Sequence, residues 1–221
     1  MNASFSMKAP ACFFFIVILF VTIAFASQDS LVTPLPKPQL EKGKPMMQVL
    51  KDRKSSRVFD TKPLPRQELA NLLWAAFGVN RPDKDGRTAP SAMDMQEIDV
   101  YAALADGLFL YEAKSHSLKK IFGKDIRELT GNQPFVKDAP LNIVLVADYS
   151  RTGKMADPSA KKFYAAADAA YISQNIYFYC ASEGLATVVR GYVDKAGLAA
   201  AMHLKPEQEV IFAQTVGYPK K

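Results

Sequence analysis

The sequence predicts an α+β domain with one mixed sheet flanked by helices. Helical and strand-like patterns alternate irregularly along the chain, and two strand-like segments near its middle form a hairpin. No internal repeat is visible. The 221 residues are enough for one domain with a well-buried core, and a content of 49% hydrophobic and 23% charged residues is ordinary for a globular protein.

The N-terminus has the pattern of an export signal. Lys8 is followed by residues 10–26, PACFFFIVILFVTIAFA, which are almost entirely apolar and end in a small-x-small motif, Ala24-Phe25-Ala26. We therefore expect residues 1–26 to be a signal peptide that is cleaved after Ala26, and the mature protein to be periplasmic or secreted. The alternative is an uncleaved membrane anchor, for which the apolar run is somewhat short.

The next segments are an arm and the start of the domain. Residues 27–44 are rich in Pro, Lys and Gln, which predicts an extended N-terminal arm. The domain is expected to span residues 45–221. It begins with a short helix over 45–52 and a longer one over 65–77, where apolar residues recur at helical spacing and Gly78 provides a stop. Residues 79–89 form a polar loop.

The remaining elements follow from the same patterns. Val, Tyr, Phe and Leu dominate the two hairpin strands, a short continuous apolar run predicts a central strand, and Gly184 ends the longest helix. Asp194 is expected to cap the last helix. The predicted strands are 98–104, 107–112, 141–147, 186–190 and 209–217, and the predicted helices are 117–129, 161–183 and 195–202.

Composition disfavours several classes of protein. Only Cys180 remains after the expected cleavage, so there is no disulfide framework, and its apolar helical surroundings predict a buried core residue. Two histidines without a cysteine cluster make a zinc site improbable. The formal net charge is +6, but the basic residues are spread out and lack the aromatic interleaving of a nucleic-acid surface.

The most informative stretch is Arg53-Lys54-Ser55-Ser56-Arg57-Val58-Phe59, which we call the basic box. Two guanidinium groups, one ammonium group and two hydroxyls can surround a phosphate monoester, because arginine offers a bidentate fork and lysine a point charge. Taken alone, the same cluster is typical of a solvated surface.

Three other segments support a ligand site. Residues 87–96, RTAPSAMDMQ, form a tight polar loop whose backbone and amide groups can bind a planar heterocycle, although a plain surface loop has the same composition. The long helix carries Gln174-Asn175 and is followed by 184–191, GLATVVRG. The chain ends in 216–221, VGYPKK, which delivers two ammonium groups unless it is a frayed tail.

The order of these segments resembles the nitroreductase family of FMN-dependent oxidoreductases. The basic box resembles that family's R-R-S-x-R-x-F box, residues 69–76 its L-x-x-L-L-x-A-A helix, and residues 90–96 its P-S-x-x-N-x-Q loop. The late helix with Gln174-Asn175 and the final V-G-Y-P also match. Residues 73–76, 87–91 and 107–111 look closest to the azoline-oxidase-like branch.

The resemblance implies a fold and a set of site residues. The fold would be a mixed, mostly antiparallel sheet flanked by helices, in an intertwined homodimer with FMN at the interface. One group of residues would hold the phosphate and the polar edge of the flavin, a second would reach the isoalloxazine from the partner subunit, and a third would lie beside the ring. These groups are, in turn, Arg53, Lys54, Ser55, Arg57, Lys220 and Lys221; Pro90, Ser91, Asp94 and Gln96; and Arg190 and Gly191.

The implied chemistry is ping-pong electron transfer, from NAD(P)H or another donor through FMN to a small nitro, quinone or azoline-like acceptor. No protein nucleophile, metal or nucleic acid is required. The chain departs from the family pattern at Asp94, where the family has asparagine, and at Glu97, where an aromatic residue is frequent. A carboxylate at position 94 would repel negative charge on the flavin and lower its potential.

Export is unusual for an enzyme that uses NAD(P)H, which is scarce outside the cytoplasm. A second hypothesis therefore stays open: a non-catalytic protein that retains the fold and binds flavin or another heterocycle.

Overall fold

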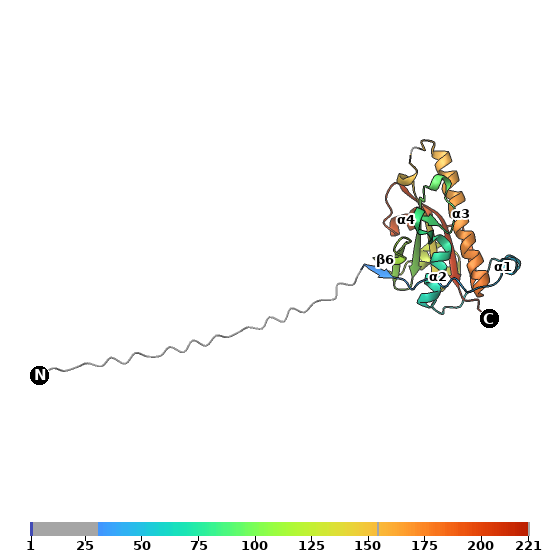
Figure 1. Cartoon of the computed structure of the whole chain (residues 1–221), viewed down its shortest axis with the longest axis horizontal. Helices are drawn as coiled ribbons and strands as arrows, with labels where there is room; N and C mark the ends of the chain where they lie inside the picture. The colour runs from blue at the N-terminus through green and yellow to red at the C-terminus, as the bar shows by residue number, and fades with distance from the viewer. Residues whose placement is uncertain (2–30, 154, 221) are drawn as a thin grey trace. The chain divides into compact units, whose positions relative to one another are not determined.

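The centre of the computed structural model is a seven-stranded sheet with the strand order β1-β6-β5-β4-β7-β9-β8. The structure describes Met1 and residues 31–153 and 155–220 (Figure 1); the predicted signal peptide lies almost entirely outside these residues. Every pairing within this sheet is antiparallel. The strands are β1 (Val32–Pro34), β4 (Ile98–Leu104), β5 (Gly107–Glu112), β6 (Ser117–Phe122), β7 (Leu141–Asp148), β8 (Ala186–Arg190) and β9 (Gln208–Gly217). The predicted α+β class is confirmed.

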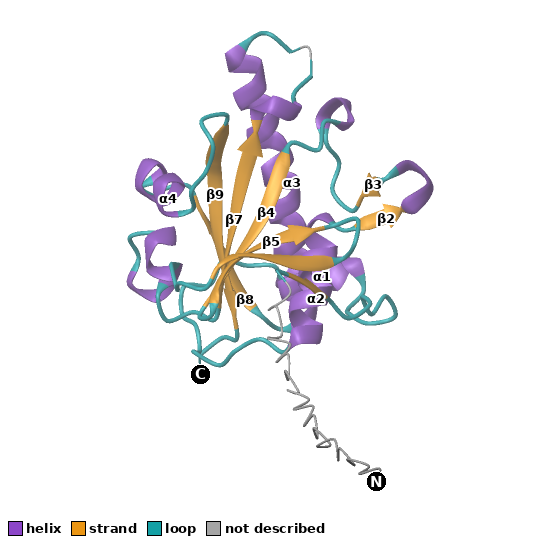
Figure 2. Ribbon diagram, turned by 90° about the vertical axis from the view of Figure 1, so that its left-hand side faces the viewer, coloured by secondary structure: helices purple, strands orange, loops and turns teal. Residues whose placement is uncertain are grey.

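Helices cover both faces of this sheet (Figure 2). Residues of α2 and α3 share one core cluster with one face, and residues of α4 share a second cluster with the other. No helix that the structure describes is long and apolar enough to cross a membrane. The helices are α1 (Met46–Asp52), α2 (Arg66–Phe77), α3 (Pro158–Glu183) and α4 (Lys195–Ala201), with the small ladder β2 (Val79–Arg81) and β3 (Gly86–Arg87) and the 3-10 turns η1 (Pro82–Lys84), η2 (Ala92–Asp94), η3 (Arg127–Thr130), η4 (Pro134–Val136) and η5 (Tyr149–Arg151).

The continuous apolar run of β7 is explained by its central position. Its side chains alternate between the two faces of the sheet: Ile143 and Leu145 pack in the α2/α3 core, whereas Val144 and Val146 pack beneath α4. A strand covered on both faces has no side open to water, so it does not show polar alternation. The central strand predicted from this run is confirmed.

The long helix α3 has well-defined ends. The carboxylate of Asp157 accepts a hydrogen bond from the Ser159 amide at 2.9 Å, Pro158 occupies the first helical position, and Gly184 ends the helix with a φ of 72°. The predicted helix is therefore confirmed and begins slightly earlier than expected. Its inward stripe consists of Ala165, Ala169, Ile172, Ile176 and Cys180.

The helix predicted over residues 117–129 is wrong. Residues 117–122 form β6, which pairs with β5 on one side and with β1 on the other. The tight turn at His116, with a φ of 46°, reverses the chain after β5, and Leu118 then enters the α2/α3 core. Cross-strand pairing and burial thus outweigh the helical propensity of the lysine and leucine residues.

The predicted N-terminal arm is extended, and its described part is attached to the domain. β1 adds to the edge of the sheet, and the buried Leu35 donates its amide to the carbonyl of His116 at 2.9 Å. The His116 ring lies between Tyr111 and Pro36: Nδ1 is 2.8 Å from the Tyr111 hydroxyl and Nε2 is 2.9 Å from the Pro36 carbonyl. Because that carbonyl can only accept, Nε2 carries the proton.

We expect His116→Ala to loosen the arm. The substitution removes both side-chain hydrogen bonds and leaves the Tyr111 hydroxyl buried without this partner, which should cost about 1–3 kcal/mol of unfolding free energy. Amide hydrogen exchange at residues 31–36 should accelerate more than exchange in β7. Tyr111→Phe is the matched control, because it removes one contact and keeps the bond to Pro36. Unchanged protection of the arm in His116→Ala would contradict the assignment.

Candidate functional site

A cationic pocket of about 670 Å³ lies beside the basic box. The end of α3, the start of β8 and the C-terminal segment complete its wall. Its lysines are Lys44, Lys51, Lys54 and Lys220. Asp52 is the one acidic residue in the described lining, and Lys44 pairs with it at 2.9 Å. The pocket therefore carries an excess of positive charge.

The basic box is held against α3 by a tyrosine that the sequence pattern did not indicate. The hydroxyl groups of Ser55 and Tyr177 lie 2.8 Å apart, and the Val189 amide donates to the Tyr177 oxygen at 3.0 Å. The Arg53 guanidinium stands over the Tyr177 ring, 5.4 Å from its centroid. The helical periodicity of α3 marks Tyr177 only as buried, and no sequence signal connects it to a segment more than a hundred residues away.

The structure brings the C-terminal segment beside the basic box. The Asp60 amide donates to the Tyr218 carbonyl at 2.9 Å, and Phe59 forms an antiparallel bridge with Pro219. Lys220 consequently lines the same pocket as Lys54. Arg57 is exposed next to this bridge, and Lys221 lies outside the described residues.

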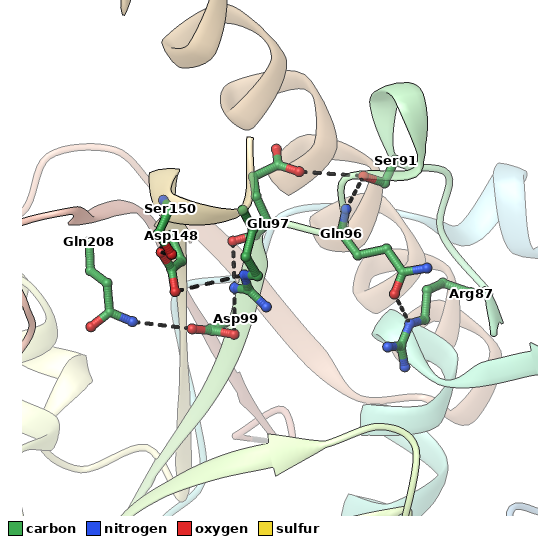
Figure 3. A network of polar contacts seen from close by, with 9 residues as sticks. Arg87, Ser91, Gln96, Glu97, Asp99, Asp148, Ser150 and Gln208 are labelled. Carbon is green, nitrogen blue, oxygen red and sulfur yellow. Dashed lines mark hydrogen bonds and ion pairs between the residues drawn. The ribbon is translucent and has the colours of Figure 1, made fainter. Parts of the chain in front are cut away.

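The predicted flavin-facing loop is held by its own side chains (Figure 3). The Ser91 hydroxyl accepts from the Gln96 amide at 2.8 Å, and the Gln96 side chain accepts from Arg87 Nε at 2.8 Å and donates to Asp94 Oδ1 at 2.9 Å. Asp94 and Gln96 both have positive φ, 54° and 50°. Asp94 and Pro90 are exposed, and one carboxylate oxygen of Asp94 accepts the hydrogen bond from Gln96.

Within one chain the loop and the basic box lie at different levels of α3. The Ala92 amide of the loop donates to Asp168 at 2.8 Å, whereas the box contacts Tyr177. At 1.5 Å of rise per residue, these two positions are about 14 Å apart along the helix. The structure therefore separates the two predicted groups, and the resemblance assigns the loop to the site of a partner subunit.

Arg190 is directed into the protein. Its side chain is buried and donates to the Thr130 carbonyl, to Asn142 Oδ1 at 3.0 Å and to Thr215 Oγ1 at 3.0 Å. Burial lowers the pKa of its guanidinium to about 10. Both terminal nitrogens of the guanidinium are thus engaged in the interior of the domain, whereas Nε is buried without a hydrogen-bond partner. The neighbouring Gly191 is exposed, and a Cβ there would meet nothing within 4 Å.

Glu97 is a buried carboxyl at the end of the loop (Figure 3). Its side chain is fully buried, Oε2 accepts from the Ser91 hydroxyl at 3.4 Å, and Oε1 has no hydrogen-bond partner. Burial raises the pKa of Glu97, and the nearby charge of Asp168 raises it further. From the sequence, Glu97 was noted only because the nitroreductase family frequently has an aromatic residue at this position; nothing indicated a buried carboxyl.

The donor set around the pocket suits a phosphate monoester. Lys54, Lys220 and the flanking Arg53 and Arg57 supply charged donors, and the hydroxyls of Ser55 and Ser56 supply neutral ones. Within the described residues, no group of three His, Cys, Asp or Glu side chains could hold a metal ion. FMN, with one phosphate monoester, fits these residues.

Comparison with known sequences identifies the family. Residues 50–218 match the nitroreductase family, and the chain belongs to that family. A candidate nitroreductase of Methanocaldococcus jannaschii, MJ1384, is 29% identical over 164 residues, which cover 70% of this chain and 81% of that protein.

Solved structures agree. The crystal structure of a candidate nitroreductase from Ralstonia eutropha JMP134 is 44% identical, with a TM-score of 0.82, and the match covers 86% of this chain and 90% of that chain. The NADPH:FMN oxidoreductase of Vibrio harveyi, complexed with NAD+, has a TM-score of 0.61 at 19% identity and covers 80% and 69% of the two chains. That second similarity concerns the fold alone.

The pKa of Glu97 gives a testable pH dependence. Because the folded pKa is raised, the protonated carboxyl favours the fold at low pH, and this contribution is lost as pH rises through the folded value. Glu97→Gln keeps the shape and cannot ionise. The variant should therefore become more stable relative to the wild type, by roughly 1–3 kcal/mol of unfolding free energy, as pH rises from about 4 to about 8. Denaturant unfolding across this range measures the difference, and parallel pH curves would refute the buried-carboxyl account.

Proposed function

We propose that this protein is an FMN-dependent oxidoreductase that takes electrons from NAD(P)H or another donor and passes them to a small organic acceptor. The observation that carries the proposal is the cationic pocket, where the basic box, Tyr177 and Lys220 meet in a member of the nitroreductase family. The fold similarity to an enzyme named NADPH:FMN oxidoreductase supports the choice of flavin.

The residues have distinct roles in this proposal. Bound FMN would supply the two-electron chemistry, and the protein would position it and tune it. Arg53, Lys54, Arg57 and Lys220 would neutralise the phosphate, and Ser55 would donate a hydroxyl hydrogen bond to it. No serine, cysteine or lysine nucleophile is required, and the buried Cys180, whose pKa burial raises, is unsuited to be one.

The acceptor class we propose comprises nitro, quinone and azoline-like compounds. The proposed location is periplasmic or secreted, after cleavage of residues 1–26, and it favours a physiological donor other than a nicotinamide. A purified protein that is yellow, bleaches with dithionite and is reoxidised by one of these acceptors supports the enzyme.

A second candidate is a non-catalytic flavin-binding protein. The exposed carboxylate of Asp94 favours it, because an acceptor-only group replaces the family's amide in the loop. A yellow protein that no donor reduces in the presence of any acceptor would support this candidate instead.

The basic box gives a direct prediction for cofactor binding. Arg53→Ala should weaken FMN binding by roughly 1.5–3 kcal/mol, the scale of a hydrogen bond to a charged group. Isothermal titration calorimetry of the apoprotein measures this loss. Lys162→Ala is the matched control, because it removes an exposed cation near the opposite end of α3. An unchanged affinity in Arg53→Ala would show that the phosphate assignment is wrong.

We also propose a homodimer, with α3 as part of its interface. The outward stripe of this helix carries no charged residue and includes the exposed side chains of Phe163 and Tyr171, with 68% and 51% of their surface accessible. The stripe follows helical spacing through Phe163, Ala167, Ala170, Tyr171, Gln174, Phe178 and Ala181. On α1, Met46, Met47 and Leu50 are exposed as well. Exposed aromatic and aliphatic side chains gathered on one helix face are typical of a protein interface.

A charge placed on the stripe should separate the subunits. Ala170→Glu puts a carboxylate on the exposed face of α3, and burying it unpaired would cost several kcal/mol. Multi-angle light scattering should therefore show a dimer for the wild type and a monomer for the variant. Ala105→Glu, in the exposed turn after β4, is the control and should remain dimeric. A stable wild-type monomer with full FMN occupancy would overturn the dimer and the role of Ser91 and Asp94 across subunits.

A further inference from the structure

We infer that Tyr177 is the positioning residue that makes this site select a phosphorylated flavin over an unphosphorylated one. The inference rests on the proposed function and extends it to a residue outside the family-like motifs. Tyr177 lines the pocket with only 7% of its surface accessible, and its hydroxyl and ring are engaged by groups of the protein, so we assign its effect to the groups that it holds.

Its hydroxyl joins two segments that form the pocket. The Val189 amide of β8 donates to the Tyr177 oxygen at 3.0 Å, and the Ser55 hydroxyl of the basic box lies 2.8 Å from the same oxygen. Thr187, near the start of that strand, accepts from the Ser56 amide at 2.9 Å. The box is therefore fixed to β8 both directly and through Tyr177.

The direction of these hydrogen bonds matters for the phosphate. Tyr177 already accepts from Val189, and its own proton can point to Ser55 Oγ. In that arrangement the proton of Ser55 remains free to donate outward. The oxygens of a phosphate dianion can only accept hydrogen bonds. Its binding therefore favours the arrangement in which Tyr177 donates to Ser55 and Ser55 donates to the phosphate.

The ring of Tyr177 holds a second phosphate partner. The Arg53 guanidinium lies 5.4 Å from the ring centroid, within the range of a cation–π contact. An arginine held in this way loses less side-chain freedom when it binds an anion. One tyrosine therefore orients both a charged and a neutral donor of the box.

A matched control residue lies on the same helix. Tyr179 is half-buried, and its hydroxyl donates to Glu68 Oε1 of α2 at 2.6 Å. It has a comparable side-chain hydrogen bond but no contact with the basic box in the described structure. Tyr179→Phe thus reproduces the loss of a tyrosine hydroxyl on α3 without the proposed effect on phosphate.

The experiment compares FMN with riboflavin, which differ only in the phosphate. Dissociation constants of both flavins are measured by fluorescence quenching with the wild type, Tyr177→Phe, Tyr179→Phe and Ser55→Ala. Tyr177→Phe should weaken FMN binding about tenfold and leave riboflavin binding unchanged. Tyr179→Phe should change the affinity for neither flavin. Ser55→Ala should weaken FMN binding alone, as Tyr177→Phe does. The double variant Tyr177→Phe/Ser55→Ala should bind FMN no more weakly than either single variant.

Other outcomes overturn the inference in separable ways. An equal loss of both flavins in Tyr177→Phe would mean a purely structural role, and an unchanged FMN affinity would mean no role in the site. If Tyr177→Phe does not fold, an unchanged preference for FMN in Ser55→Ala refutes the relay. A wild type that binds riboflavin as tightly as FMN would refute the phosphate pocket itself, and with it the proposed function.

Discussion

The packing of α3 against the sheet is the constraint on which the candidate site depends. Its inward stripe, including Ile172 and Ile176, is fully buried in the α2/α3 core, which fixes the rotation of the helix. That rotation places Asp168 against the flavin-facing loop and Tyr177 against the basic box. Two segments that are distant in sequence therefore take their positions from one helix. A shift of α3 would move both together.

Much of the fold could be predicted from the sequence because its strongest patterns are local. The apolar run of β7, the hairpin of β4 and β5 and the Gly184 stop of α3 each depend on a few neighbouring residues. β6 could not be predicted in this way. Its pairing with β1 and β5 comes from tertiary contacts, and the left-handed turn at His116 carries no glycine signal.

The candidate site likewise contains residues that the sequence indicates and residues that only the structure reveals. The basic box and the C-terminal lysines are visible as composition, and the structure places Lys220 beside the box. Tyr177 and Glu97 are not visible, because each resembles an ordinary residue until its partners are known. Arg190 shows the opposite limit. The resemblance placed it beside the ring, and the structure shows that its guanidinium donates to three interior acceptors, Thr130, Asn142 and Thr215, which no sequence pattern indicated.

The density of cations in the basic box also follows from where the pocket lies. Many phosphate sites use the amides and positive dipole of a helix N-terminus. This pocket instead adjoins the C-terminal end of α3, where Gly184 lines its wall and the dipole is negative. An anion there gains nothing from the helix and must be neutralised by side chains. Arginines and lysines drawn from the box and from the C-terminus meet that requirement, and a tyrosine on the same helix holds the first of them in place.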